Sequence, residues 1–394
     1  MRYTLGPDSL PQDADAATLV GRAWLPDAGG PAVVTIREGR VIDVTRHWPT
    51  VSLLLSESDP TAALCQATGT DIGAIANLLA NSTPDAQDAS RPWLLAPCDL
   101  QAVKAAGVTF VRSMLERVIE EQAKGDPAAA EGIRVEMQAA IGDDLRAVRP
   151  GSPEAQRLKQ ALVERRLWSQ YLEVGIGPDA EIFTKAQPLS SVGTGAEIGI
   201  HPVSTWNNPE PEVVLAIGPD GVIRGAALGN DVNLRDVEGR SALLLGKAKD
   251  NNGSCAIGPF IRLLDQGFTL DDIRQAEVVL TVAGDDGFRL EGRSRMGEIS
   301  RDITDIAGQA IGPNHQYPDG LMLFTGTMFA PIEDRDAAGQ GFTHKLGDIV
   351  TIASARLGRL TNRVNRTDRI PPWRFGTAAL MHNLSARGLL GTPR

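Results

Sequence analysis

The residues of this chain that offer chemistry most clearly are three carboxylates and a lysine near its middle. Glu210 and Glu212 are separated by one residue and precede an apolar run, and Asp231 and Lys249 follow later. Residues i and i+2 of a strand point to the same face, so the two glutamates are expected to aim at one point. Carboxylates that converge need a counter-charge, which a hard divalent cation supplies. The pattern favours a site for Mg²⁺, with Mn²⁺ as the alternative ion; solvated acids at a strand start are the competing interpretation.

The elements around these residues are expected to bring the acids together. Residues 213–217 form an apolar run typical of a strand, 218–221 favour a tight turn, and 222–223 begin the returning strand. The return would bring Asp231 back to the glutamate pair. An acid pair with one intervening residue is a weak signal alone, whereas the complete set of three acids and a lysine is more specific.

The complete set resembles the fumarylacetoacetate hydrolase family. Members carry E-x-E before a strand, an Asp after the next hairpin, and a Lys ahead of a Gly-Pro, which here is Gly258 and Pro259. The resemblance runs from about Val108 to about Leu360 and is greatest to the sugar-acid dehydratase branch. It implies an α+β protein, with a mixed β-roll catalytic domain of this family and a smaller β-rich N-terminal domain.

The resemblance also implies roles for individual residues. Glu210, Glu212 and Asp231 would be the metal ligands, and Lys249 would stabilise negative charge on the substrate. Glu181 matches the acid–base residue of the dehydratase branch, with a surface or capping glutamate as the alternative.

Substrate contacts are expected from several further residues. Lys185 lies in an element similar to the family's P-E-x-F-x-K, where a structural ion pair is the alternative. The remaining expected contacts, each of which could instead be structural, are Arg112, Ser113, Asn252 and Thr327.

One departure from the family's hydrolases bears on the reaction. Those enzymes carry Y-x-x-H-x-x-E, whose His and Glu activate water, whereas this chain has Phe110, Ser113 and Glu116 at these positions. Without the histidine there is no dyad to activate water, so the resemblance favours a lyase over a C–C bond hydrolase.

The implied function is Mg²⁺-dependent dehydration of a 2-keto-3-deoxy-D-pentonate, the keto acid derived from D-xylonate or D-arabinonate. The product would be 2-oxoglutarate semialdehyde, formed in non-phosphorylative pentose catabolism. Mg²⁺ would withdraw charge from the keto group and acidify the C3 protons, while Glu181 moves protons. Three alternatives use the same metal site: an acylpyruvate or diketoacid hydrolase, an oxaloacetate-type decarboxylase, and a keto-acid sensor without turnover.

Composition limits the partners and the location. The chain has 394 residues and a net charge of −10, which argues against a nucleic-acid binder. No apolar run reaches the roughly 18 residues needed to span a bilayer, so no membrane partner is expected. The three cysteines lack C-x-x-C spacing, and with no evident signal peptide they indicate reduced, buried residues in a cytoplasmic protein. The family resemblance implies a homo-oligomer, either a dimer or a tetramer.

The chain is expected to divide into an N-terminal domain over 1–95 and a catalytic domain over 96–394. In the first domain, 33–44 favours a β-hairpin, 51–55 favours a strand, and 70–81 has helical spacing.

The catalytic domain is expected to contain a helical insert at about 111–173. Periodic apolar residues predict helices over 107–122, 131–148 and 153–173, the last with Ser152 as its N-cap.

Overall fold

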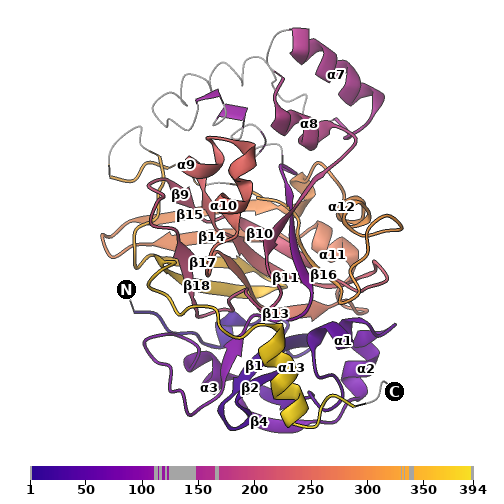
Figure 1. The fold of residues 1–394 in the computed structure, drawn as a ribbon, viewed down its shortest axis with the longest axis vertical. Helices are drawn as coiled ribbons and strands as arrows, with labels where there is room; N and C mark the ends of the chain where they lie inside the picture. Colours follow the sequence, from indigo (N-terminus) through magenta and orange to yellow (C-terminus); the bar gives the residue numbers. More distant parts are fainter. Residues whose placement is uncertain are drawn as a thin grey trace.

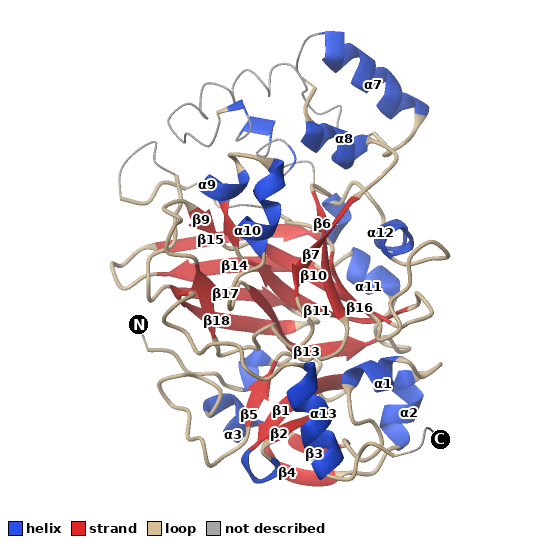
Figure 2. Ribbon diagram, viewed as in Figure 1, coloured by secondary structure: helices blue, strands red, loops and turns tan. Residues whose placement is uncertain are grey.

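The computed structural model describes most of the chain and shows an α+β fold built around two large β-sheets (Figures 1 and 2). The described residues are 2–110, 114, 118–119, 122–123, 148–164, 168–329, 331, 333–336 and 341–391. Arg112 and Ser113, two of the expected substrate contacts, lie outside them.

The larger sheet combines strands from the beginning, middle and end of the chain. Among the described residues it has eleven strands, in the order β4 (Thr70–Ala74), β3 (Arg40–Asp43), β2 (Gly30–Arg37), β1 (Leu19–Leu25), β13 (Cys255–Leu263), β11 (Ile223–Asp231), β10 (Pro211–Ile217), β16 (Leu321–Phe324), β6 (Ala102–Gly107) and β7 (Glu181–Ala186), with β5 (Trp93–Leu95) beside β1. The predicted hairpin over 213–231 is confirmed as the antiparallel pair β10 and β11 at the centre of this sheet.

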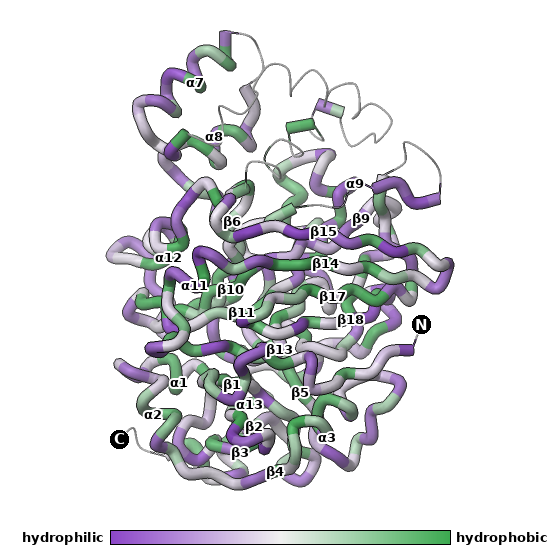
Figure 3. Tube along the Cα trace, turned by 180° about the vertical axis from the view of Figure 1, so that it is seen from behind, coloured by the Kyte–Doolittle hydropathy of each residue, from purple (hydrophilic) through white to green (hydrophobic). Residues whose placement is uncertain are grey.

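A second sheet packs against the first. Its five strands, in the part of the chain that the structure describes, are β15 (Arg289–Arg295), β14 (Glu277–Ala283), β17 (Ile349–Ser354), β18 (Gly358–Arg366) and β8 (Glu197–Ile200). The edge strand β15 alternates exposed and buried residues and is coloured mainly as hydrophilic in Figure 3. A short ribbon of β9 (Asn207–Asn208) and β12 (Asn233–Leu234) extends from the end of β10 and β11.

Strand β10 is buried on both faces, which explains its unbroken apolar run. Val213, Leu215 and Ile217 belong to a core shared with the second sheet. Val214 and Ala216 face the opposite way, into a core shared with residues of the N-terminal region. The strand therefore has a rigid frame on both sides at the point where its side chains change from apolar to acidic.

Short helices surround the sheets, and most of them are one or two turns long. They are α1 (Val51–Leu55), α2 (Pro60–Gln66), α3 (Ile75–Ala80), α7 (Pro153–Glu164), α8 (Gln170–Ile176), α9 (Arg235–Glu238), α10 (Leu245–Lys249), α11 (Leu270–Arg274), α12 (Ile303–Ala310) and α13 (Thr377–Ala386). None of the described helices has the length and apolar character needed to cross a bilayer.

The N-terminal strands continue the central sheet. Strand β1 pairs with β13, where Leu19 lies opposite Arg262. Helix α13, near the end of the chain, lies beside these strands in Figure 1, and Asn383 donates to the Ala28 carbonyl at 2.8 Å. The division of the chain at residue 95 stays a prediction.

Residues 51–55 form a helix, so the predicted strand is wrong. The Thr50 side chain accepts a hydrogen bond from Leu53 N at 3.1 Å, and the Asp99 carboxylate accepts from the first two helical N–H groups at 2.6 and 3.0 Å. Acceptors at these free N–H groups stabilise a helix start. Because Asp99 is remote in the sequence, the apolar run itself did not reveal the helix.

The helix predicted over 70–81 is correct only in its second half. Residues 70–74 form β4, which pairs with β3 at the sheet edge, and α3 begins only at Ile75. The hairpin over 33–44 is confirmed by β2 and β3.

The described part of the predicted insert is helical but divided differently. Ser152 accepts from Ala155 N at 3.1 Å, as expected of an N-cap, but the helix over 153–173 is split into α7 and α8. Strand β6 continues to Gly107, so no helix starts there. The helix predicted over 131–148 lies outside the described residues, except for its last residue.

Candidate metal centre

The three central carboxylates converge where β10 and β11 leave the apolar core. In the ribbon, Glu212 lies opposite Gly229, and Asp231 N donates to the Glu210 carbonyl at 3.0 Å. One carboxylate oxygen from each of the three acids lies within 4.8 Å of the others. The spacing of the acids predicted this arrangement. Val214 is two residues beyond Glu212 on the same face and packs into the core, so the polarity of this face changes within one step of the strand.

The cluster has an excess of buried negative charge. Glu210, Glu212 and Asp231 are each at most 1% exposed. Burial raises the pKa of Glu212 well above its usual range, and the like charges of Asp231 and Glu210 raise it further. The donors are all carboxylate oxygens, which suit a hard divalent cation such as Mg²⁺ or Mn²⁺. By geometry, burial and charge, the three acids fit such an ion.

Two lysines offset part of this charge. Lys249, at the end of α10, contacts the Glu210 carboxylate and lies 3.1 Å from Asp231 Oδ2. Lys185, from β7, lies 2.9 Å from Asp231 Oδ1. Three carboxylates against two ammonium groups leave one negative charge for a cation to offset.

Lys185 is fully buried and is not among the residues that line the adjacent cavity. Its ammonium also donates to the Lys249 carbonyl and to the Val232 carbonyl, the latter at 3.3 Å. The structure thus places Lys185 as an ion-pair partner of Asp231, the structural alternative considered from the sequence. Its expected contact with substrate stays a prediction.

Gly326 and Thr327, which follow β16, hold Glu212. Gly326 N donates to Glu212 Oε2 at 2.7 Å, and Thr327 Oγ1 donates to Oε1 at 3.3 Å. Gly326 has a φ of +107°, and a Cβ there would lie 1.9 Å from Thr109 Oγ1. No side chain fits at this position, so only glycine can present its backbone N–H to the Glu212 carboxylate here.

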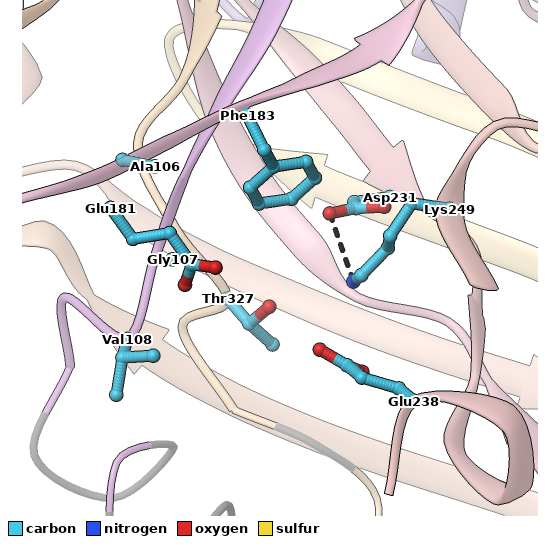
Figure 4. A pocket seen from close by; sticks show the side chains of 9 residues that line it. All are labelled: Ala106, Gly107, Val108, Glu181, Phe183, Asp231, Glu238, Lys249 and Thr327. Atoms are coloured by element: carbon cyan, nitrogen blue, oxygen red, sulfur yellow. Dashed lines mark hydrogen bonds and ion pairs between the residues drawn. The ribbon is translucent and has the colours of Figure 1, made fainter. Parts of the chain in front are cut away.

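A cavity adjoins the carboxylates (Figure 4), and its empty space of about 330 Å³ includes part of the open solvent in front of it. Its lining residues are Ala106, Gly107, Val108, Glu181, Phe183, Asp231, Glu238, Lys249 and Thr327. Four of the residues singled out from the sequence, Glu181, Asp231, Lys249 and Thr327, therefore share one cavity.

Glu181 owes its position to a glycine on the neighbouring strand. Strands β6 and β7 pair Gly107 with Glu181, and a Cβ on Gly107 would lie 1.9 Å from Glu181 Oε2. The glutamate therefore lies across Gly107 at the cavity wall.

Glu238 is a third acid on this cavity, beside Glu181 and Asp231, and the sequence did not single it out. It ends the short helix α9, is 7% exposed, and lies on the other side of Thr327 from Glu181 in Figure 4. Its only sequence signal is its place seven residues after Asp231, in a stretch that also contains Asp236. Nothing in the sequence separates the buried Glu238 from Asp236, which accepts hydrogen bonds from Ser204 Oγ and Thr205 N at 2.7 and 2.8 Å.

Asn252 is placed away from the cavity lining. Its Nδ2 donates to the carbonyls of Thr367 and Pro371 at 3.1 and 3.3 Å. These contacts hold the chain that follows β18. The predicted contact between Asn252 and substrate has no support from this geometry and stays a prediction.

Two curated relatives share part of this sequence. The 2-dehydro-3-deoxy-D-arabinonate dehydratase of Saccharolobus solfataricus is 31% identical over 193 residues, which are 48% of this chain and 60% of that protein. The probable 2-keto-3-deoxyxylonate dehydratase of Haloferax volcanii is 29% identical over 201 residues, 51% of this chain and 65% of that protein. The matched part thus spans less than two thirds of either relative. No family model matches the chain.

Solved structures match over most of the chain. A 2-keto-3-deoxy-D-arabinonate dehydratase complexed with magnesium and 2,5-dioxopentanoate has a TM-score of 0.60 at 21% identity, covering 89% of this chain and 99% of that one. A fumarylacetoacetate hydrolase from Exiguobacterium antarcticum has a TM-score of 0.53 at 16% identity, covering 89% and 100%. The chain therefore has the fumarylacetoacetate hydrolase fold, and its sequence is similar to those of 2-keto-3-deoxy sugar-acid dehydratases.

Proposed function

We propose that the protein is a divalent-metal-dependent hydro-lyase that converts a 2-keto-3-deoxy-D-pentonate to 2-oxoglutarate semialdehyde. The observation that carries the proposal is a buried triad of carboxylates beside a cavity that also contains Glu181, Glu238 and Lys249. The names of the two relatives support the substrate class, since both are dehydratases of keto-deoxy sugar acids. The magnesium and 2,5-dioxopentanoate of the similar structure support the ion and the product, because 2,5-dioxopentanoate is the same semialdehyde.

Glu210, Glu212 and Asp231 would hold the ion, since their oxygens converge and their charge exceeds that of the two lysines. When bound there, Mg²⁺ supplies Lewis-acid polarisation of the keto group at C2, which makes the C3 protons more acidic.

Dehydration requires a base at C3 and an acid at the C4 hydroxyl. Glu181, which lines the cavity, would take a proton from C3, and Glu238, which lies across Thr327 from it, would protonate the departing hydroxyl (Figure 4). Lys249 would stabilise the negative charge that develops on the C2 oxygen. Loss of one proton from C3 and hydroxide from C4 yields water and an unsaturated keto acid.

A second stage rearranges that product without further reagents. A proton leaves C5 and another is added at C3, which moves the double bond to C4–C5 and leaves an enol at C5. The enol becomes the aldehyde when C4 takes a proton and the hydroxyl loses one. The two carboxylates on the cavity wall can carry both transfers, because each alternates between acid and base.

Semialdehyde release from 2-keto-3-deoxy-D-xylonate tests the proposal. The assay compares the wild type with Glu212→Gln, each with Mg²⁺ and with EDTA. Turnover that EDTA and the substitution both abolish is expected. A wild type that binds Mg²⁺ but releases no semialdehyde would contradict the dehydratase and favour diketoacid hydrolysis or decarboxylation at the same centre.

We also propose that the protein works in the cytoplasm as a homo-oligomer. The cysteines form no disulfide among the described residues, which is consistent with a reducing compartment. Cys98 and Cys255 are buried, as expected from the sequence, whereas Cys65 is exposed, so that expectation was wrong for Cys65. The resemblance to the fumarylacetoacetate hydrolase family supports the homo-oligomer; the exposed side chains of Leu243 and Met381 are single residues and do not by themselves mark an interface. Light scattering on the purified protein would give the assembly size, and a monomeric mass would refute the oligomer.

A further inference from the structure

The ribbon that carries the metal-centre carboxylates continues beyond them as a pair of amides. Strands β9 and β12 pair Asn208 with Asn233, in the same register as β10 and β11. Residues two apart in a strand share a face, and so do partners across an antiparallel pair. Asn208 and Asn233 therefore extend the face that carries Glu210 and Asp231.

This amide pair is buried but poorly satisfied. Both side chains are 0% exposed. Within the described parts of the chain, Asn233 has no hydrogen-bond partner for either Oδ1 or Nδ2, and Asn208 has none for Oδ1. Asn208 Nδ2 donates only to the Pro209 carbonyl, at 2.9 Å. Unpaired buried polar atoms destabilise a folded protein, so native proteins commonly satisfy such groups with ordered water.

The free hydrogen-bonding groups of the two amides indicate what kind of ligand they can bind. Two free amide oxygens and one free NH₂ group suit a small group that both donates and accepts hydrogen bonds, which a metal ion cannot do. A water molecule has this character. Strand geometry places the Cα atoms of the amide pair about 6–7 Å from those of Glu210 and Asp231. Side chains on the same face can lean toward each other to the roughly 4.5 Å that two hydrogen bonds of about 2.8 Å span through one water.

We propose that Asn208 and Asn233 hold an ordered water that hydrogen-bonds Glu210 and Asp231 and so positions these carboxylates for the divalent cation. The two asparagines act on the metal ligands and not on the substrate, so they are positioning residues. The inference rests on the metal centre of the proposed function and is independent of which substrate the protein takes.

Manganese affinity tests the amide pair without reference to catalysis. The metal-free wild type, Asn233→Leu, Asn208→Leu and the double variant are titrated with Mn²⁺, and free Mn²⁺ is read by electron paramagnetic resonance. Loss of a hydrogen-bonding partner of a metal ligand typically weakens binding about 10–100-fold, and each single variant is expected in that range. The double variant should bind no more weakly than the weaker single one, since both substitutions remove the same water.

A thermal melt of each metal-free variant separates positioning from a structural role. Leucine removes the amide and its water together and fills the space with apolar atoms of similar size, so the melting temperature should hold or rise while Mn²⁺ affinity falls. A fall in both together would overturn the proposal, as would unchanged affinity in the single variants. Asn233→Ser keeps a donor and an acceptor and should retain most of the affinity, which preserves the test if leucine prevents folding.

Asn207→Leu is the matched control. Asn207 is adjacent and buried, and its Oδ1 is also unpaired, but it points to the opposite face of the ribbon. The Asn207→Leu variant should leave Mn²⁺ affinity unchanged. A loss of affinity equal to that of the Asn208 and Asn233 variants would show that leucine disturbs the ribbon in general. Failure of the wild type itself to bind Mn²⁺ would refute the proposed metal centre, whereas wild-type binding that the variants do not alter would refute only the amide pair.

Discussion

Two buried acidic clusters in this molecule are balanced in opposite ways. Before β17, Arg335 donates to both oxygens of Asp348 at 2.6 and 2.9 Å, and both side chains are 1% exposed. Burial raises the pKa of Asp348, but hydrogen bonds from Arg335 and His344 outweigh it, so the pKa is lowered. At the metal centre, burial and like charges raise the pKa of Glu212.

The difference teaches that an uncompensated charge, rather than burial, distinguishes the candidate site. The Asp348 carboxylate has a bidentate guanidinium partner and needs nothing further. The carboxylates of the metal centre outnumber their two lysines, and two of the acids share Lys249. Such an excess destabilises the metal-free protein, and structures retain it where a ligand or a reaction uses it.

The largest expected effect is that Glu212→Gln lowers turnover strongly without lowering the stability of the metal-free protein. The substitution removes an acid whose ionised form is disfavoured by burial and by the neighbouring carboxylates, so the metal-free protein should be as stable as the wild type or more stable. Turnover should fall by more than the roughly 100-fold that loss of an outer partner can cost, because a ligand itself is lost. Urea unfolding of the metal-free protein measures its stability, and the semialdehyde assay measures its turnover.

Added Mg²⁺ extends that test. At 100 times its dissociation constant, a ligand stabilises the folded protein by about 2.7 kcal/mol, so Mg²⁺ should stabilise the wild type and have little effect on Glu212→Gln. Glu291→Gln, which changes an exposed acid on β15, is the control and should match the wild type. A Glu212→Gln protein that loses stability without metal would show that this charge supports the fold.

Arg335→Leu breaks the balanced cluster instead. It leaves Asp348 buried without its guanidinium partner, and loss of one member of a buried pair costs about 3–5 kcal/mol of unfolding free energy. Mg²⁺ affinity should be retained, because no atom of Arg335 contacts the metal-centre acids among its described interactions. Arg40→Leu removes an exposed pair with Asp71, which solvent screens, and should cost much less unfolding free energy than Arg335→Leu. Equal costs for the two arginines would refute the contrast between buried and exposed pairs.

The sequence predicted the parts of the site that follow from local periodicity. The two-residue repeat of a strand and one tight hairpin suffice to bring Glu210, Glu212 and Asp231 together: Glu212 and Asp231 lie on the adjacent strands β10 and β11, and Glu210 directly precedes β10. The fold class followed from the resemblance that these residues carry.

The remaining features depend on contacts between distant segments. Residues 51–55 become a helix because Asp99 caps them, and Glu238 becomes a cavity residue because α9 packs over the ribbon. Lys185 looked like a substrate contact because its type and spacing fit, yet its burial behind Asp231 is set by β7 pairing with β6. No local pattern encodes these placements.

The smallest expected change is Gly107→Ala, which alters the site without altering either charge cluster. The new methyl group would lie 1.9 Å from Glu181 Oε2, and only the flexible end of that side chain must move. Stability should therefore change by no more than about 0.5 kcal/mol. Turnover should fall about 100-fold, the size of effect that a displacement of about 1 Å produces in a reacting group.

The double variant with Glu181→Gln decides whether the glycine acts through the glutamate. If it does, Gly107→Ala adds little to the loss caused by Glu181→Gln, because the displaced group is already inactive. Gly308→Ala, at a helical position with no atom within 4 Å of the new Cβ, controls for the substitution itself and should leave turnover unchanged. Mg²⁺ affinity should be the same in every one of these variants, since the metal-centre acids keep their contacts. Full turnover in Gly107→Ala would remove Glu181 from the proton transfers and leave Glu238 as the carboxylate to test.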